Sequence, residues 1–247
     1  MTIDKSLTID CEGVQAHFTG VLGGIVVNGA PTDIVILRGL DMFEGAGNGI
    51  VVTGGPTVHV EKCVIHLFPT GWGIFVQTQA SSTKAELYVS DTVLADNGFT
   101  VAGGGIIVQP GVSNTVSKVV LNRVEVQGNF FGIKADATQV SGGVIQMTIR
   151  DSVSSGNASN GIVATGNASG PAIVMMIDRS TSSHNAAGFG VIADGPKTTI
   201  RLGGSSIAGN PTGVGVSNGG VLESYGTNQI NGNSNDGIAS LTPIGLH

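Results

Sequence analysis

Charged and aromatic residues are scarce in this chain of 247 amino acids. Only 11% of the residues are charged and 4% are aromatic, whereas 40% are hydrophobic. A helical protein of this size normally carries more lysine and glutamate, and a disordered chain is far less apolar. The composition therefore favours many short β-strands joined by turns, for which the chain has 40 glycines.

Positive charge and long apolar runs are also lacking. The chain has 11 lysines and arginines against 17 aspartates and glutamates, a net charge of −6. This balance cannot neutralise a phosphate backbone, so we expect no nucleic-acid partner. No apolar run is long enough to span a bilayer, and no signal peptide opens the sequence. Residues 1–7 already have the pattern of a strand, which predicts that further residues precede them in the natural chain.

Only two cysteines occur, Cys11 and Cys63. In the repeat described below they fall two coils apart, about 10 Å, which is beyond disulfide reach. We therefore expect two small, buried thiols. The histidines show no spacing typical of a zinc site, and the nonapeptide of calcium-binding β-rolls is absent. The sequence accordingly predicts no metal site and no cofactor.

What the sequence does have is a Gly–Ile or Gly–Val step that recurs nine times from end to end. Its spacing varies from 23 residues (Gly190 to Gly213) to 32 residues (Gly73 to Gly105). A period of this size that tolerates insertions is typical of a solenoid. Because the repeat covers the whole chain, we expect a single domain over residues 1–247. The glycines of these steps are Gly24, Gly49, Gly73, Gly105, Gly132, Gly161, Gly190, Gly213 and Gly237.

Each repeat contains two apolar segments, one after the Gly–Ile step and a second, longer one that ends near an asparagine. The links between them are too irregular for hairpins, so equivalent segments must stack in parallel to satisfy their backbone groups. Asparagine tolerates a sharp turn, and stacked copies can exchange amide hydrogen bonds as a ladder. The pattern predicts an all-β fold, a single-stranded right-handed parallel β-helix of about nine coils. The asparagines are Asn97, Asn129, Asn157, Asn185, Asn210 and Asn233.

The Gly–Ile strands, the asparagine-ended turns and the opening segment from Ser6 to Asp10 resemble the right-handed parallel β-helix superfamily, the fold of pectate lyases and many bacterial repeat proteins. The resemblance covers nearly the whole chain and implies a secreted or cell-surface bacterial protein. The superfamily includes lyases, hydrolases, epimerases and non-catalytic modules. The catalytic motifs of its polygalacturonase-like, pectate-lyase-like and alginate-epimerase-like members are absent here, so no catalytic residue carries over.

A column of charged residues lies six positions before the asparagines and alternates in sign. It includes Asp91, Arg123, Asp151 and Arg179. We expect these residues to form ion pairs between adjacent coils. The alternative is a polar groove that binds an anionic sugar, with Arg123, Arg150 and Arg179 as its cations. Trp72, which precedes a strand, either stacks on a sugar ring or covers the core.

The residue after each Gly–Ile step should point outward, because side chains alternate along a strand. The resulting column is largely apolar and longer than the patches that soluble monomers expose. Cover by another copy of the chain or by the chain's own segments would each explain it. The predicted interface residues are Val26, Val51, Phe75, Ile107, Val163 and Ile192.

A polar column follows the apolar one and contains the candidate catalytic residues. Asp136 and Asp194 are expected two coils apart, about 10 Å, with Lys134 nearby. This separation is near the carboxylate spacing of inverting glycosidases, although chance proximity of turn residues is the favoured explanation.

Two functions therefore remain open. The first is a non-catalytic scaffold or binding module that associates with itself through the apolar strand face. The alternative is a carbohydrate-active enzyme, a lyase, hydrolase or epimerase that acts on an acidic or bacterial polysaccharide.

Overall fold

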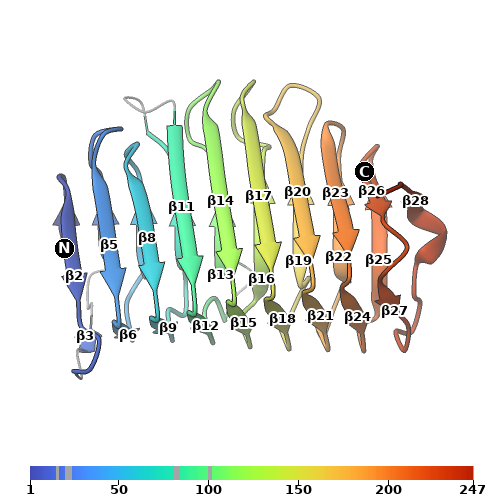
Figure 1. Cartoon of the computed structure of the whole chain (residues 1–247), viewed down its shortest axis with the longest axis horizontal. Helices are drawn as coiled ribbons and strands as arrows, with labels where there is room; N and C mark the ends of the chain where they lie inside the picture. The colour runs from blue at the N-terminus through green and yellow to red at the C-terminus, as the bar shows by residue number, and fades with distance from the viewer. Residues whose placement is uncertain (15–16, 20–23, 80–83, 100–101, 247) are drawn as a thin grey trace.

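The computed structural model describes residues 1–14, 17–19, 24–79, 84–99 and 102–246. Their strands form three parallel sheets, and the chain passes from the first sheet to the second and the third before it returns to the first. Figure 1 shows the strands of the second sheet side by side along the long axis, with β2 at one end and β26 and β28 at the other. This arrangement is a parallel β-helix, so the predicted fold class is confirmed.

Within the described residues the three sheets contain nine, ten and nine strands. The first sheet consists of β1 (Thr2–Ile3), β4 (Ile25–Val27), β7 (Ile50–Val52), β10 (Trp72–Val76), β13 (Gly104–Val108), β16 (Phe131–Asp136), β19 (Ile162–Thr165), β22 (Phe189–Asp194) and β25 (Thr212–Ser217). The second sheet consists of β2 (Leu7–Asp10), β5 (Ile34–Arg38), β8 (Thr57–Glu61), β11 (Lys84–Ser90), β14 (Val116–Asn122), β17 (Val144–Arg150), β20 (Ala172–Asp178), β23 (Thr198–Gly203), β26 (Val221–Ser224) and β28 (Leu241–Pro243). The third sheet consists of β3 (His17–Thr19), β6 (Asp41–Phe43), β9 (Val64–His66), β12 (Val93–Ala95), β15 (Glu125–Gln127), β18 (Val153–Ser155), β21 (Thr181–Ser183), β24 (Ser206–Ala208) and β27 (Gln229–Ile230).

The helical content of the described residues is one 3-10 turn, η1 (Ile238–Ser240). No helix in this part of the chain is long and apolar enough to cross a membrane.

The core is a continuous stack of aliphatic side chains that point inward from all three sheets. On the first sheet, Ile50, Ile74 and Ile106 lie in register on neighbouring strands and are fully buried. Because neighbouring strands share one register, each inward apolar side chain packs on the equivalent side chain of the next coil. All strands of a sheet therefore have the same alternation of inward and outward side chains. This repetition explains why the fold could be read from the sequence.

The asparagine ladder runs along the corner that follows the third sheet. The ladder begins at Asn97, whose side-chain oxygen accepts the backbone N–H of Phe68 at 3.1 Å. Each later asparagine accepts, at its side-chain oxygen, hydrogen bonds from both the backbone and the side-chain nitrogen of the asparagine one coil earlier. Asn129 donates in this way to Asn157 at 3.1 and 3.2 Å, and Asn157 to Asn185 at 3.2 and 2.9 Å. Asp236 ends the ladder, because it accepts the same pair of bonds from Asn233. The predicted ladder is confirmed.

The ladder requires a glycine at several of the Gly–Ile steps. A Cβ atom on Gly161 would lie 2.6 Å from Asn185 Nδ2, and one on Gly132 would lie 2.9 Å from Asn157 Nδ2. Real Cβ atoms do not approach other atoms so closely. The two regularities of the sequence are therefore linked along most of the ladder, where the glycine leaves the space that a ladder amide fills. These glycines are Gly73, Gly132, Gly161, Gly190 and Gly213.

A second ladder of hydroxyl groups follows the second sheet and was not predicted. Ser152 Oγ accepts the backbone N–H of Val124 at 3.1 Å, and Ser180 Oγ accepts that of Ser152 at 3.2 Å. Cys63 occupies the equivalent position in an earlier coil, where its N–H donates to Thr92 Oγ1 at 3.3 Å. Burial raises the pKa of the Cys63 thiol. Cys63 is thus a small buried residue of a turn, and both cysteines are free, although Cys11 is only half-buried.

Candidate functional site

The corner between the second and third sheets carries the column of alternating charges. Each coil places one residue there in the left-handed region, with φ of 50° for Asp91, 54° for Arg123, 50° for Asp151 and 45° for Arg179. Arg123 Nε and Nη2 donate to the two oxygens of Asp91 at 2.6 and 2.7 Å. Arg179 binds Asp151 in the same bidentate way, with both distances 2.9 Å. The predicted ion pairs between adjacent coils are confirmed.

The same corner brings together the three arginines considered as sugar-binding residues. Arg150 Nε lies 3.4 Å from Asp151 Oδ2 and 3.9 Å from Asp178 Oδ2. Arg179 also donates from Nη1 to Asp178 Oδ2 at 2.7 Å. The hydrogen bonds from Arg179 hold the pKa of Asp151 below its usual range. Each arginine therefore already faces a carboxylate of this chain, which reduces its attraction for an anionic ligand.

The predicted apolar column exists on the outer face of the first sheet, since its six residues share one register position. Its exposure changes along the molecule. Val26, Val51 and Phe75 are half-buried. Ile107, Val163 and Ile192 expose only 3%, 5% and 8% of their surface. The apolar face that remains accessible is thus its N-terminal part.

Aromatic and charged side chains of the same sheet lie beside this column and contact one another. The ring of Trp72 lies over Gly104, where a Cβ atom would be 2.7 Å from Trp72 Cζ3, and it stacks beside Phe131 at 6.1 Å between ring centres. Lys134 Nζ lies 5.3 Å from the centre of the Phe131 ring and 3.0 Å from Asp136 Oδ2. The lysine therefore bridges the aromatic and polar columns that flank the apolar one. These contacts favour Trp72 as a covering residue over a free platform for sugar.

The candidate catalytic residues lie on this face but do not converge. Asp136 and Asp194 are in register with Thr165 between them, two strands apart as expected. Asp136 is 5% exposed and accepts hydrogen bonds from Thr138 N at 3.0 Å and Thr138 Oγ1 at 2.6 Å. Asp194 instead accepts from Asn218 Nδ2 at 2.7 Å. Each carboxylate is therefore held by separate partners.

The charge state of Asp136 follows from its surroundings. Burial acts to raise its pKa, but the hydrogen bonds of Thr138 and the charge of Lys134 outweigh that effect and hold the pKa below its ordinary value. The carboxylate is consequently ionised at neutral pH and paired with the lysine.

This depressed pKa makes the stability contribution of Asp136 dependent on pH. A group whose pKa is lower in the folded than in the unfolded state stabilises the protein above the unfolded value of about 4, and the contribution is lost as pH falls through the folded pKa. We expect Asp136→Asn to lower the free energy of unfolding by about 1–3 kcal/mol at pH 7. Urea melts at pH 7 and at pH 3 measure the difference, which should shrink at the lower pH. A difference that is constant over this range would contradict the ionised pair.

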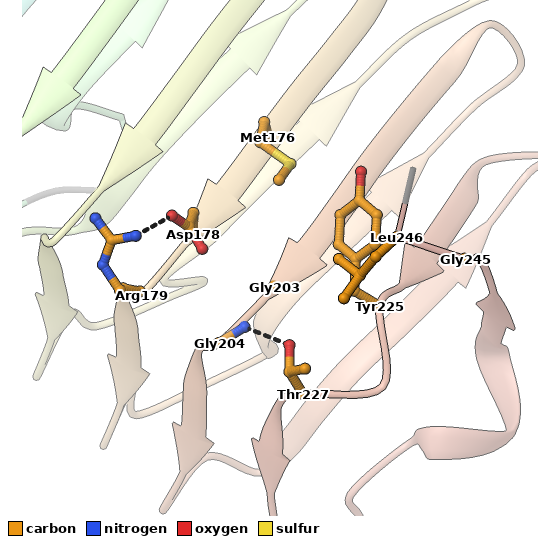
Figure 2. A pocket seen from close by; sticks show the side chains of 9 residues that line it. All are labelled: Met176, Asp178, Arg179, Gly203, Gly204, Tyr225, Thr227, Gly245 and Leu246. Carbon is orange, nitrogen blue, oxygen red and sulfur yellow. Dashed lines mark hydrogen bonds and ion pairs between the residues drawn. The ribbon is translucent and has the colours of Figure 1, made fainter.

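A pocket of about 430 Å³ opens where the charged column stops (Figure 2). Gly203 and Gly204 take the positions that Asp178 and Arg179 occupy one coil earlier, so two side chains are missing. This pocket was not predicted from the sequence. The feature of the sequence that could have indicated the pocket is Gly204, an uncharged residue that interrupts the column of alternating charges. The lining residues are Met176, Asp178, Arg179, Gly203, Gly204, Tyr225, Thr227, Gly245 and Leu246.

Within the described residues, no cluster of three or more histidine, cysteine, aspartate or glutamate side chains could hold a metal ion. No protein-family model matches the chain, and no curated protein matches it. Among solved structures the chain is similar to the Dettilon tailspike protein, with 13% sequence identity and a TM-score of 0.36. The match covers 98% of this chain and 60% of the tailspike chain, so the chain spans less than two thirds of that protein's length.

Proposed function

We propose that this protein is a non-catalytic β-helix module that binds other molecules through its outer faces. The observation that carries the proposal is the pairing of the candidate catalytic groups. Lys134 lies 3.0 Å from Asp136, and the pKa of this carboxyl group is below its usual range. A general acid or base is most effective when its pKa is near the working pH. An inverting glycosidase also needs one of its carboxyl groups protonated as the general acid, a role for which the lowered pKa makes Asp136 unsuited.

The charged residues at the corner between the second and third sheets also support a non-catalytic function. An enzyme that eliminates from a uronate must neutralise the substrate's carboxylate with a cation of its own. Arg123 and Arg179 are instead bound in bidentate fashion to Asp91 and Asp151. A ladder of this kind holds adjacent coils together, a structural role that requires no ligand.

A cleavage assay tests the proposal against the enzymatic alternative. Wild type, Lys134→Ala and Asp136→Asn are incubated with pectate, alginate and bacterial exopolysaccharides, and new reducing ends and unsaturated ends are measured. We expect no product from any of the three proteins. Product formed by the wild type would overturn the proposal, and its loss in a folded Asp136→Asn variant would make Asp136 a catalytic residue.

We further propose that the accessible part of the apolar column, Val26, Val51 and Phe75, contacts a second copy of the chain. All three side chains are half-buried. Val26 and Val51 also line a hollow of about 350 Å³, together with Met1 and Ala46, that an apolar side chain of a partner would fill. A straight column can meet its own copy across a two-fold axis, which makes such a contact self-complementary.

This proposal also includes a polysaccharide partner and a single domain over residues 1–247. It further includes the secreted or cell-surface placement that the superfamily resemblance implies.

A further inference from the structure

The pocket in Figure 2 is a gap in two otherwise continuous columns of side chains. Along the second sheet one outward column contains Asn122, Arg150 and Asp178 in successive coils. Gly203 follows Asp178 in this register. A Cβ atom on Gly203 would lie 3.3 Å from Tyr225 Cδ2 and 3.5 Å from Asp178 Oδ1. Tyr225 and Asp178 therefore form opposite walls, separated by the space of the missing side chain.

The two walls differ in chemistry. On one side, Arg179 Nη1 donates to Asp178 Oδ2, so the other oxygen of this carboxylate, Oδ1, is the one nearest the gap. On the other side stands the half-buried ring of Tyr225, with Leu246 beside it (Figure 2). The carboxylate of Asp178, a hydrogen-bond acceptor, thus faces the aromatic ring of Tyr225 across the backbone of Gly203 and Gly204, which forms the floor of the pocket.

The floor adds a hydrogen-bond donor. Thr227 Oγ1 accepts the N–H of Gly204 at 2.9 Å. The hydroxyl hydrogen of Thr227 is then directed away from that nitrogen and can be donated to a ligand. The bound carboxylates balance the arginines of this corner, so the pocket offers polar groups without a strong excess of either charge.

We propose that this pocket binds an uncharged sugar ring, as the ligand site of the binding module proposed above. A pyranose has an apolar face that packs on an aromatic ring and hydroxyl groups that donate to a carboxylate, which matches Tyr225 and Asp178. The volume of about 430 Å³ lies within the range of small-molecule sites. A uronate is disfavoured, because its carboxylate would approach Asp178.

The test fills the pocket without altering its polar groups. Gly203 has ordinary backbone angles for a strand, and the nearest atoms leave room for a Cβ with a small shift, so Gly203→Val should fold. Ser90→Val is the matched control, since Ser90 lies in the same outward column on β11, far from the pocket. Tyr225→Ala removes the aromatic wall, and thermal melting checks that each variant is folded.

Isothermal titration with maltose, cellobiose, lactose and N,N′-diacetylchitobiose measures binding, with digalacturonate as the charged comparison. We expect at least one neutral disaccharide to bind the wild type, and Gly203→Val and Tyr225→Ala to weaken binding by about tenfold or more. Ser90→Val should bind like the wild type. The inference is overturned if no neutral disaccharide binds, if digalacturonate binds best, or if both pocket variants bind as well as the wild type. Cleavage of a polysaccharide would instead overturn the proposed function, so the two failures are distinct.

Discussion

Replacing Asn157 with alanine should lower the free energy of unfolding by about 2–4 kcal/mol. Asn157 is fully buried in the middle of the ladder. Its side chain accepts two hydrogen bonds from Asn129 and donates to Asn185 Oδ1 and Ser154 Oγ. Alanine would leave these buried groups without partners, and the cavity is too enclosed for bulk water to replace the lost amide. Chemical denaturation followed by circular dichroism measures the loss.

The end of the ladder provides the matched control. Asn233 occupies the same position in a later coil but is only half-buried, and its partner Asp236 lies in the following turn. Asn233→Ala should therefore cost less than half as much as Asn157→Ala. Equal losses at the two positions would mean that the ladder contributes through its turn geometry alone and that burial of the amide is unimportant.

The features that could be predicted from the sequence are those that repeat. A parallel β-helix places equivalent residues in contact, so a requirement at one coil recurs at the next. The ladder of Asn129, Asn157 and Asn185 and the glycines that make room for it are visible for this reason. The hydroxyl ladder was missed because its column is mixed, with Cys63, Thr92 and Val124 in successive coils before the serines begin. Different residues can satisfy the same turn, which hides the column in the sequence.

The accessibility of the apolar column could not be predicted in the same way. Alternation along a strand indicates which side chains point outward, and the six predicted residues do share one register position. Whether an outward side chain remains accessible depends on its neighbouring side chains, which differ from coil to coil. The pocket is a further case, since it arises from the absence of side chains at Gly203 and Gly204. A glycine in a chain with 40 of them carries little information by itself.

Because the two positions differ in accessibility, aspartate substitutions at Ile107 and Val51 should have different effects, although the sequence pattern predicts the same effect for both. Ile107 and Val51 share one column, but Ile107 is 3% exposed and Val51 is half-buried. We expect Ile107→Asp to destabilise the fold by about 3–5 kcal/mol, because it places a carboxylate in a buried apolar site whose neighbouring cation, Lys134, is already paired with Asp136. Val51→Asp should leave the melting temperature nearly unchanged and prevent self-association instead. Thermal melting and light scattering, measured on the same samples, resolve the two effects.

Val174→Asp controls for the substitution itself, because Val174 is an outward valine of similar kind on the second sheet, 38% exposed. It should change neither the melting temperature nor the oligomeric state. Self-association through the first sheet requires that the wild type form a dimer and that Val51→Asp alone convert it to a monomer. A monomeric wild type, or a dimer that survives Val51→Asp, would show that this face does not contact a second copy. A folded Ile107→Asp variant with wild-type stability would contradict the burial of this position.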